Sequence, residues 1–513
     1  MSARHGTGRR VAGGGQGRAR APAAAARSAP AVRAVAAARL APAALALAAV
    51  LGLSACSTVA PRDRGQLSIP ADYKEATVAG GATWIVAGSA AQPIAPDWWR
   101  GFDDPELDRL LREASVASPT IAEAAANLAE AEALVRETRA ARFPSLGANL
   151  GVQRSGGRRS IDQTSTSVTL SADWVPDLFG VIGQAVDASR ATAEARAADL
   201  AAARLAVQSE LAVNLLSLRE ADAEMALLDR TLVGYERSLQ IANNRYAAGV
   251  TARTDVFQAE TQLATTRADR AALENDRATL EHAIAVLVGR APADLRIEPI
   301  PWAQATPVVP VGLPSTLLER RPDIAAAERA VAAASGQLGV ARAAWYPSLA
   351  LGGSLGTGGS RIGDLFSVSG LLWSAGVSVA QAVFDGGARS ARIAGAEAAR
   401  DAALARYRQT VLVAFRTVED QLSAARSLEA QERLRRIASE AADRTEQQIE
   451  NRYRSGIVNY TEVVTAQAQA LAARRSLIQV VVNRQVAAVT LVRALGGGWS
   501  TAEIAPVATG GRP

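Results

Sequence analysis

The stretch Arg245-Tyr-Ala-Ala-Gly249-Val-Thr-Ala-Arg-Thr254-Asp255-Val256 returns 207 residues later as Arg452-Tyr-Arg-Ser-Gly456-Ile-Val-Asn-Tyr-Thr461-Glu462-Val463. In each copy an Arg-Tyr pair precedes a glycine, and a threonine with an acidic residue follows it. A glycine directly after a helix-forming run is typical of a helix end, and an acidic residue is typical of the first turn of the next helix. Each stretch is therefore expected to be the tight turn of a helical hairpin.

The repeat extends well beyond these two turns. Phe143-Pro-Ser-Leu146 returns as Tyr346-Pro-Ser-Leu349, and Pro119 with Ile121 returns as Pro322 with Ile324, both 203 residues later. The turn at Asp177-Leu-Phe-Gly180 has a partner at Phe384-Asp-Gly-Gly387. The chain is thus expected to contain two structural repeats, residues 104–291 and 318–495. A proline-rich linker, residues 292–317, joins them, and residues 496–513 form a C-terminal tail.

Each half contains a long stretch that favours helix. No proline occurs between Pro176 and Pro292 or between Pro347 and Pro506, and both stretches are rich in Ala, Leu, Glu, Arg and Gln, which have high helix propensity. We predict helices over about 183–246 and about 254–288 in the first half, with counterparts in the second. At 1.5 Å per residue the first would be roughly 95 Å long. A helix of that length has to pack along its side as a coiled coil.

Between the helical regions the pattern changes to the period of two that is typical of strands. Apolar residues alternate with small polar residues over 146–153 and 168–174, and the second half repeats this over 349–356 and 374–379. These are predicted to be β-hairpins at about 145–176 and 348–383, with loops at Ser155-Gly-Gly-Arg-Arg and Gly356-Thr-Gly-Gly-Ser. Strands of about 9 to 11 residues are long enough to cross a bilayer when tilted. Trp174 and Trp373 near strand ends fit a membrane interface.

Four strands are too few to form a membrane barrel. Lipid offers no hydrogen bonds to an open sheet edge, so membrane strands must close on themselves. Single-sheet membrane barrels start at about eight strands. Several copies must therefore share one barrel, and the helices that follow each hairpin should continue it as a helical tube.

Residues 1–55 are expected to be a bacterial export signal. They contain eight arginines, no Asp, Glu or Lys, and an uncharged apolar run at 40–53 that is too short to span a bilayer. Leu53-Ser-Ala-Cys56 resembles a lipobox, so Cys56 is expected to carry a diacylglycerol and an N-acyl chain as the first mature residue. A cysteine that merely follows a leader is the alternative. By resemblance to enterobacterial lipoproteins, Ser57 favours the outer membrane, and 56–103 would be a lipidated extended segment that leads into an equatorial region.

The composition argues against several classes of function. The formal charge of +6 falls to about −2 without the eight leader arginines, so the charge does not indicate a nucleic-acid partner. The chain has one Cys, two His (His5 and His282) and one Lys (Lys74). These cannot supply a disulfide within the chain, a zinc cluster or a G-x-x-x-x-G-K phosphate loop. No catalytic residue, metal ligand or cofactor is therefore assigned, apart from the acyl chains on Cys56.

The sequence resembles the outer-membrane factor family typified by TolC, specifically its lipoprotein branch of the NodT and OprM type. The match is carried by Leu318-Glu-Arg-Arg-Pro-Asp-Ile324, Tyr346-Pro-Ser-Leu349, Phe384-Asp-Gly-Gly387 and the two Arg-Tyr-x-x-Gly turns, and it spans about 98–495. The resemblance implies an α+β membrane protein: a homotrimer with a twelve-stranded barrel in outer-membrane lipid, four strands per chain. A periplasmic α-helical barrel and an equatorial mixed region, built from segments such as 292–318 and the tail, would complete it.

The resemblance also implies a function and partners. The chain would be the passive exit duct of a tripartite efflux system for drugs or other small molecules. It would dock to a periplasmic membrane-fusion (adaptor) protein and to an inner-membrane pump of the resistance-nodulation-division class, and it would reside in the cell outer membrane.

In that family the helix tips close the tunnel with carboxylates and hydrogen-bonded tyrosines. Matched residue by residue, Asp255 and Glu462 take the acidic positions, Tyr453 takes the aromatic one, and Thr465 stands where relatives often carry a second Asp. A carboxylate ring would select cations and respond to pH and salt. Asp255 and Glu462 could instead be N-terminal helix caps, and both roles can coexist. The residues assigned to the tip turns and to adaptor docking are Arg245, Tyr246, Gly249, Thr254, Arg452, Gly456 and Thr461.

Three other functions compete with the efflux duct. The same architecture could serve type I protein secretion. A periplasmic adaptor lipoprotein would need compact soluble β domains around a single hairpin, whereas two hairpins are predicted here. A soluble enzyme would need a constellation of catalytic residues that two His and one Cys do not supply.

Overall fold

A computed structural model describes residues 69–76, 84–86, 94–157, 160–312, 314–360 and 371–503. All of them belong to one compact unit that covers Arg64–Pro513. The predicted export signal, the lipidation site Cys56 and the tail beyond residue 503 lie outside the described residues.

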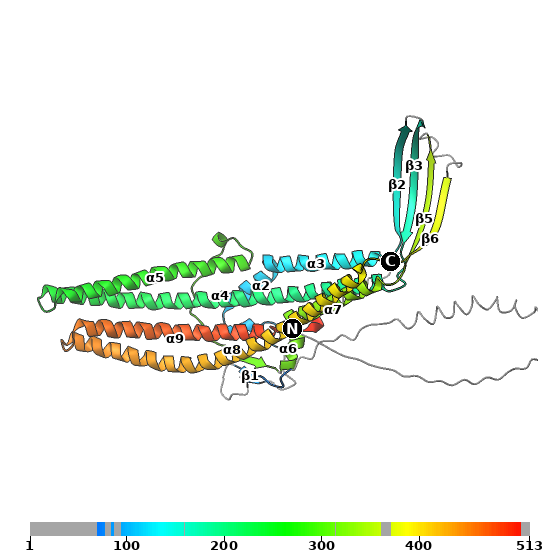
Figure 1. The fold of residues 1–513 in the computed structure, drawn as a ribbon. Coiled ribbons are helices and arrows are strands. Elements are labelled where there is room, and N and C mark those ends of the chain that lie inside the picture. The colour runs from blue at the N-terminus through cyan, green and yellow to red at the C-terminus, as the bar shows by residue number, and fades with distance from the viewer. Residues whose placement is uncertain are drawn as a thin grey trace, which may run out of the picture. The chain divides into compact units, whose positions relative to one another are not determined.

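The long helices come in two series of equal length. The members of each pair have 22, 67 and 35 residues. The first series is α3 (Pro119–Ala140), α4 (Val181–Ala247) and α5 (Arg253–Leu287), and the second is α7 (Pro322–Ala343), α8 (Ala388–Arg454) and α9 (Tyr460–Ala494). At 1.5 Å per residue α4 and α8 are each about 100 Å long. Because α4 packs along α5, and α8 along α9, the chain forms two long helical hairpins (Figure 1). The predicted ends of α4 and α5 agree with the structure within two residues.

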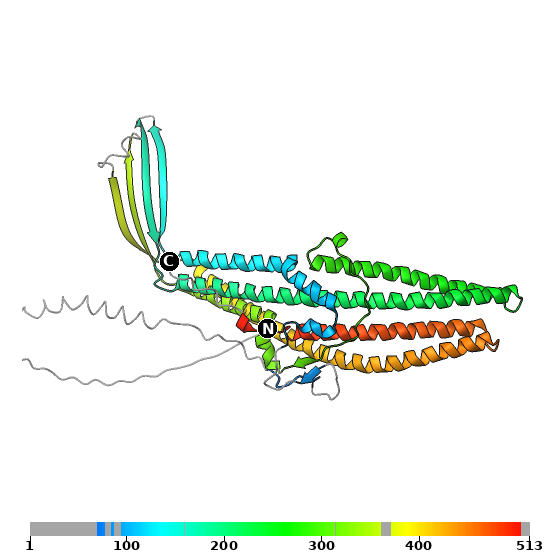
Figure 2. The same ribbon diagram turned by 180° about the vertical axis from the view of Figure 1, so that it is seen from behind.

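Four strands form one antiparallel sheet. Its order is β2 (Ser145–Gly157), β3 (Ser160–Trp174), β5 (Ser348–Gly359) and β6 (Leu371–Ala380). The two β-hairpins lie side by side through β3 and β5, and β2 and β6 form the edges (Figures 1 and 2).

The strands are longer than the sequence predicted. They have 13, 15, 12 and 10 residues, so three of the four exceed the expected range of about 9 to 11. Residues 155–157 and 356–359, expected to be loops, belong to β2 and β5. Apart from Gly156, where the register between β2 and β3 shifts, these residues pair with a neighbouring strand, which compensates for the low strand propensity of glycine.

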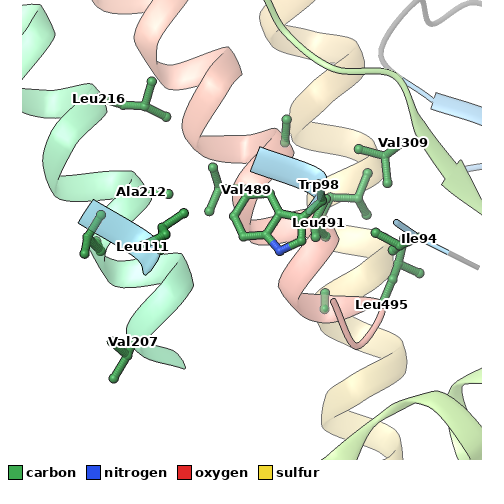
Figure 3. Close-up of a cluster of buried hydrophobic side chains, with 14 of the residues drawn as sticks. Ile94, Trp98, Leu111, Val207, Ala212, Leu216, Val309, Val489, Leu491 and Leu495 are labelled. Carbon is green, nitrogen blue, oxygen red and sulfur yellow. The ribbon is translucent and has the colours of Figure 1, made fainter. Parts of the chain in front are cut away.

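The main hydrophobic core lies where the N-terminal segment and the linker cross the long helices. Trp98 lies among Leu111, Val309, Val489 and Leu491, which come from three other elements (Figure 3). The long helices α4, α5, α8 and α9 all contribute to this core. The short elements of the chain are β1 (Trp84–Val86), η1 (Trp98–Phe102), α2 (Pro105–Ala117), η2 (Pro292–Asp294), β4 (Val309–Val311), η3 (Pro314–Thr316), α6 (Leu317–Arg320) and η6 (Thr501–Glu503). The sequence did not predict the parallel pairing of β1 with β4.

Buried polar side chains bind the linker to the helices. Gln485 of α9 is fully buried; its Oε1 accepts from Trp302 Nε1 at 3.1 Å, and its Nε2 donates to the carbonyls of Ala303 at 2.9 Å and Ala305 at 2.8 Å. In the first half of the chain, Arg219 of α4 donates a hydrogen bond to the carbonyl of Glu298 at 3.0 Å. The two halves of the chain are therefore joined by a segment that is fixed to both hairpins.

Replacing Gln485 with alanine should lower the thermal stability. The change leaves the Trp302 N–H and two carbonyls without this partner, which costs roughly 1 to 3 kcal/mol where such groups stay buried. We expect a lower midpoint of helix unfolding by circular dichroism in detergent. Gln431→Ala is the matched control, because the exposed Gln431 bonds only Ser427 of its own helix. Equal midpoints for the two variants would show that Gln485 does not hold the linker.

Candidate functional site

The sheet has one apolar and one polar face. Residues directly opposite each other in an antiparallel pair point to the same side. Leu150 stands opposite Val168, and Leu351 opposite Val377, whereas the intervening positions pair Asn149 with Thr169 and Gly352 with Gly376. On the polar face the hydroxyls of Ser354 and Ser374 lie 2.8 Å apart. The predicted alternation thus sorts almost all large apolar side chains of the four strands onto one side.

The apolar face is exposed in the single chain. Leu146, Leu150, Val377 and Val379 are each between 68% and 73% accessible, and Trp373 is 76% accessible. None of the described helices covers them (Figure 1). A contiguous apolar surface of this kind on a sheet marks a membrane or protein contact.

Aromatic residues gather where the strands meet the helices. The rings of Phe179 and Tyr346 stack 4.9 Å apart, and Arg389 stands 4.6 Å from the centre of the Trp345 ring. Phe143 and Phe384 are largely exposed. Such a band fits the interface between hydrocarbon and water.

Two aspartates lie in the turns that connect the sheet to the long helices. Asp177 accepts from the amides of Ile182 at 3.0 Å and Gly183 at 2.6 Å at the start of α4. Asp385 accepts from the amide of Gly387 at 3.0 Å and from Arg389 at the start of α8. Because amides at a helix start lack partners in the helix, carboxylates suit both positions.

The two tip turns end α4 and α8 in the same way. Gly249 and Gly456 have φ angles of 72° and 73°. A residue with a side chain would strain the backbone at these angles. Gly249 donates to the Tyr246 carbonyl, and the next amide donates to the Arg245 carbonyl, both at 2.9 Å; the second turn repeats both bonds with Tyr453 and Arg452. These are Schellman motifs, and the residue after each glycine usually packs back onto its helix. Here Val250 and Ile457 are 62% and 65% accessible.

Arg245 and Tyr453 join the two hairpins at their tips, and we call this pair the tip latch. Nη1 of Arg245 donates to the Tyr453 carbonyl at 2.9 Å, and its guanidinium carbon lies 4.6 Å from the centre of the Tyr453 ring. The repeat counterparts behave differently: Arg452 and Tyr246 are exposed. The first half thus provides the cation of the latch and the second half provides the ring.

Tyr460 is a member of this site that the sequence did not single out. It is 2% accessible, and its ring centre lies 5.4 Å from that of Tyr453. Both tyrosines belong to a buried cluster that also contains Ala242, Val256, Ala259 and Val463. The available signal was a difference between the copies, because the counterpart of Tyr460 in the first turn is Arg253.

The acidic residues of the tips lie in the first helical turns but are not the N-caps. The N-cap residues are Ala252 and Asn459, and Asn459 Oδ1 accepts from the amide of Glu462 at 3.1 Å. The interpretation of Asp255 and Glu462 as caps is therefore wrong, although carboxylates there still favour the helix start.

The structure brings only part of the predicted gate together. Burial raises the pKa of Tyr453, Arg245 opposes this shift, and the nearby carboxylate of Asp255 adds to it. Glu462 and Thr465 are exposed, and the Thr465 hydroxyl donates to the Thr461 carbonyl at 2.8 Å within α9. Asp255 thus lies close to the tip latch, whereas Glu462 and Thr465 are exposed on the surface of the single chain.

A groove of about 700 Å³ lies between α5 and α9 near the tips. Phe257 and Thr261 line it from α5, and Thr461 and Val464 line it from α9; the exposed Thr254 is also part of its wall. At one end Arg475 forms ion pairs with Glu224 at 3.2 Å and Asp269 at 3.6 Å. Among the described residues no group of three or more His, Cys, Asp or Glu could hold a metal ion.

An exposed apolar sheet that continues into long hairpins latched at their tips defines a channel-type outer-membrane protein. Comparison with known proteins gives the family. Residues 110–290 and 313–497 match the family described as Outer membrane efflux protein, and the chain belongs to this family. The two matched segments correspond to the two halves of the chain.

The chain aligns with most of the length of individual relatives. The chain is 32% identical over 461 residues to Outer membrane protein OprJ of Pseudomonas aeruginosa, covering 87% of this chain and 96% of OprJ. It is 29% identical over 405 residues to the probable outer membrane lipoprotein SilC of Salmonella typhimurium, covering 78% and 88%. The solved structure of the outer-membrane channel OprN is similar with a TM-score of 0.77 and 30% identity, covering 85% and 98%.

The chain is accordingly an outer-membrane efflux protein, and the predicted family, function and location are confirmed. The adaptor alternative is set aside, because the family is one of outer-membrane channels.

Replacing Arg245 with alanine should loosen the tips. The hydrogen bond and the cation–π contact together contribute about 2 kcal/mol, so the population of open tips should rise roughly thirtyfold. We expect a higher conductance in planar bilayers.

Two variants serve as controls for this prediction. Tyr453→Phe keeps the carbonyl and the ring and should leave the conductance low. Arg444→Ala removes an exposed arginine of α8 that pairs only with Glu440 of its own helix. If Arg245→Ala and Arg444→Ala conduct equally, the latch does not hold the tips together.

Proposed function

We propose that three copies of this chain form the outer-membrane duct of a tripartite efflux system. The sheets join edge to edge into a twelve-stranded barrel, and the helical hairpins continue it as a periplasmic tunnel. The observation that carries this proposal is the pair of sheet edges. Among the described strands, β2 and β6 each have one neighbour, and the apolar face between these edges is exposed. In lipid such edges require strands from another copy.

The small side chains of the polar face favour three copies over two. That face carries glycine at positions 147, 151, 352, 356, 358 and 376, and serine at about half of the other described positions. The interior of an eight-stranded barrel is just wide enough for side chains to fill. Serine and glycine could not fill it, so two copies would enclose a void. Twelve strands enclose a water-filled lumen, for which short polar side chains are suited.

We propose that the tips and the groove between α5 and α9 receive a periplasmic adaptor. Val250, Ile457 and Phe257 expose apolar surface there, beside polar threonines. A groove between two helices has the shape to accept a further helix. An inner-membrane pump of the resistance-nodulation-division class would supply the energy, while the duct itself stays passive. The cargo would be drugs or other small molecules.

The barrel model predicts opposite effects for two neighbouring residues of β2. Leu150→Arg places a charge on the lipid face, which costs about 2 to 4 kcal/mol near the bilayer midplane. Asn149→Arg places the same charge on the polar face and should be tolerated. We expect outer-membrane fractions to contain assembled Asn149→Arg protein and much less Leu150→Arg protein. Equal amounts of both would contradict the assignment of the faces.

The efflux role is tested by deleting the gene, together with related ducts, in its host. We expect lower minimal inhibitory concentrations for a panel of drugs and dyes, restored by the wild-type gene. A variant with Cys56→Ser should restore them less well if acylation of Cys56 anchors the protein. Unchanged susceptibility together with loss of a secreted protein would favour the type I secretion alternative.

A further inference from the structure

The polar face of the sheet carries a single charged residue among the strand residues whose side chains are described. This residue is Asp173, the last but one residue of β3. It stands opposite Ser145 on β2 and opposite Gly352 on β5. All other described positions on this face hold Ser, Gly, Thr, Asn, Gln, Ala or the single Leu372. Among the described strand residues, Asp173 is therefore the one charged side chain on the polar face, at the end of the sheet that leads into α4.

The packing of the described residues does not require a carboxylate at this position. Asp173 is exposed, and its carboxylate forms no ion pair or hydrogen bond with the described residues. Aspartate is also unfavourable in a strand. The nearby acids Asp177 and Asp385 differ, because both bind amides at a helix start. The lack of a local partner leaves Asp173 free to act on the lumen.

The neighbours of Asp173 leave the lumen open at its level. Ser145, Asp173, Gly352 and Gly376 form one row across the four strands. A Cβ atom at Gly352 would lie 3.6 Å from Asp173 Oδ1, and one at Gly376 would meet no atom within 4 Å. The sheet therefore has room for side chains in this row, and the glycines keep the surroundings of the carboxylate wide and polar.

We propose that Asp173 makes the tunnel end of the barrel selective for cationic over anionic solutes. The proposal rests on the trimeric duct, in which three copies of Asp173 form a ring at one level. A twelve-stranded barrel with strands about 4.8 Å apart and tilted by about 40° has a backbone radius of roughly 12 Å. The three carboxylates would then lie roughly 10 Å from the axis.

The ionic strength decides how strongly such a ring acts. The Debye length is about 10 Å at 0.1 M salt and about 30 Å at 0.01 M. At 0.1 M the field of the ring is already weakened at the axis, whereas at 0.01 M it extends across the whole lumen. Selectivity for cations should therefore increase as the salt is diluted.

The test is the reversal potential of single channels in planar bilayers under a KCl gradient from 0.01 to 0.1 M. All variants carry Asp255→Asn and Glu462→Gln, so that the tip acids do not contribute. We expect Asp173→Asn to lower the permeability ratio of K⁺ to Cl⁻ severalfold. Gly376→Asp in the Asp173→Asn protein should restore it, because this row has room for a carboxylate, and Gly376→Lys should shift it toward Cl⁻.

The outcomes separate this proposal from the duct itself. An unchanged reversal potential for Asp173→Asn, with Gly376→Asp still effective, overturns the role of Asp173 and leaves the duct standing. If neither Gly376 variant has an effect, the polar face does not line the pore and the proposal fails with it. If the parent protein, which carries only Asp255→Asn and Glu462→Gln, forms no channel, the trimeric duct itself is overturned.

Discussion

An unpaired strand edge cannot persist in lipid, and the rest of this structure depends on that constraint. One chain offers four strands with free edges at β2 and β6 and an exposed apolar face between them. Such a sheet is complete only when identical sheets continue it on both sides. In the proposed trimer, the turns at Asp177 and Asp385 would carry the same rotational symmetry from the strands into the helices. The symmetry of the proposed helical tube would then follow from that of the barrel.

The long helices need support of a different kind. A pair of helices about 100 Å long has little interior, and their buried residues are mostly Ala, Leu and Val. The main core is instead concentrated around Trp98 and the linker, where η1, α2 and β4 pack against the long helices. Gln485 and Arg219 fix the linker there through backbone carbonyls. This core region holds the two hairpins beside each other. The tips are joined by the smaller buried cluster that contains Tyr453 and Tyr460.

Much of this fold could be predicted from the sequence because its periods are long and regular. The helices α4 and α5 were placed within two residues, and the alternation of apolar residues gave the two faces of the sheet. The pairing of β1 with β4 could not be predicted, since a three-residue strand has no period to detect. The strands were predicted too short because Gly356 and its neighbours look like a loop, although a paired neighbour holds them extended.

At the tips the limit of sequence reasoning is the similarity of the two copies. Both contain the same Arg-Tyr pair before a glycine, yet Tyr453 is buried and Tyr246 is exposed. That difference is set by how the hairpins pack, which no local pattern records. The same holds for Tyr460, whose role depends on contacts across the hairpins.

The split of the tip latch between the two hairpins has a consequence for stoichiometry. One hairpin of each chain carries Arg245 and the other carries Tyr453, so displacing either hairpin releases both. In a ring of three chains, a ligand protein would not need to engage all six hairpins. Contact with one hairpin of each chain, three contacts in all, would be enough to release all three tip latches.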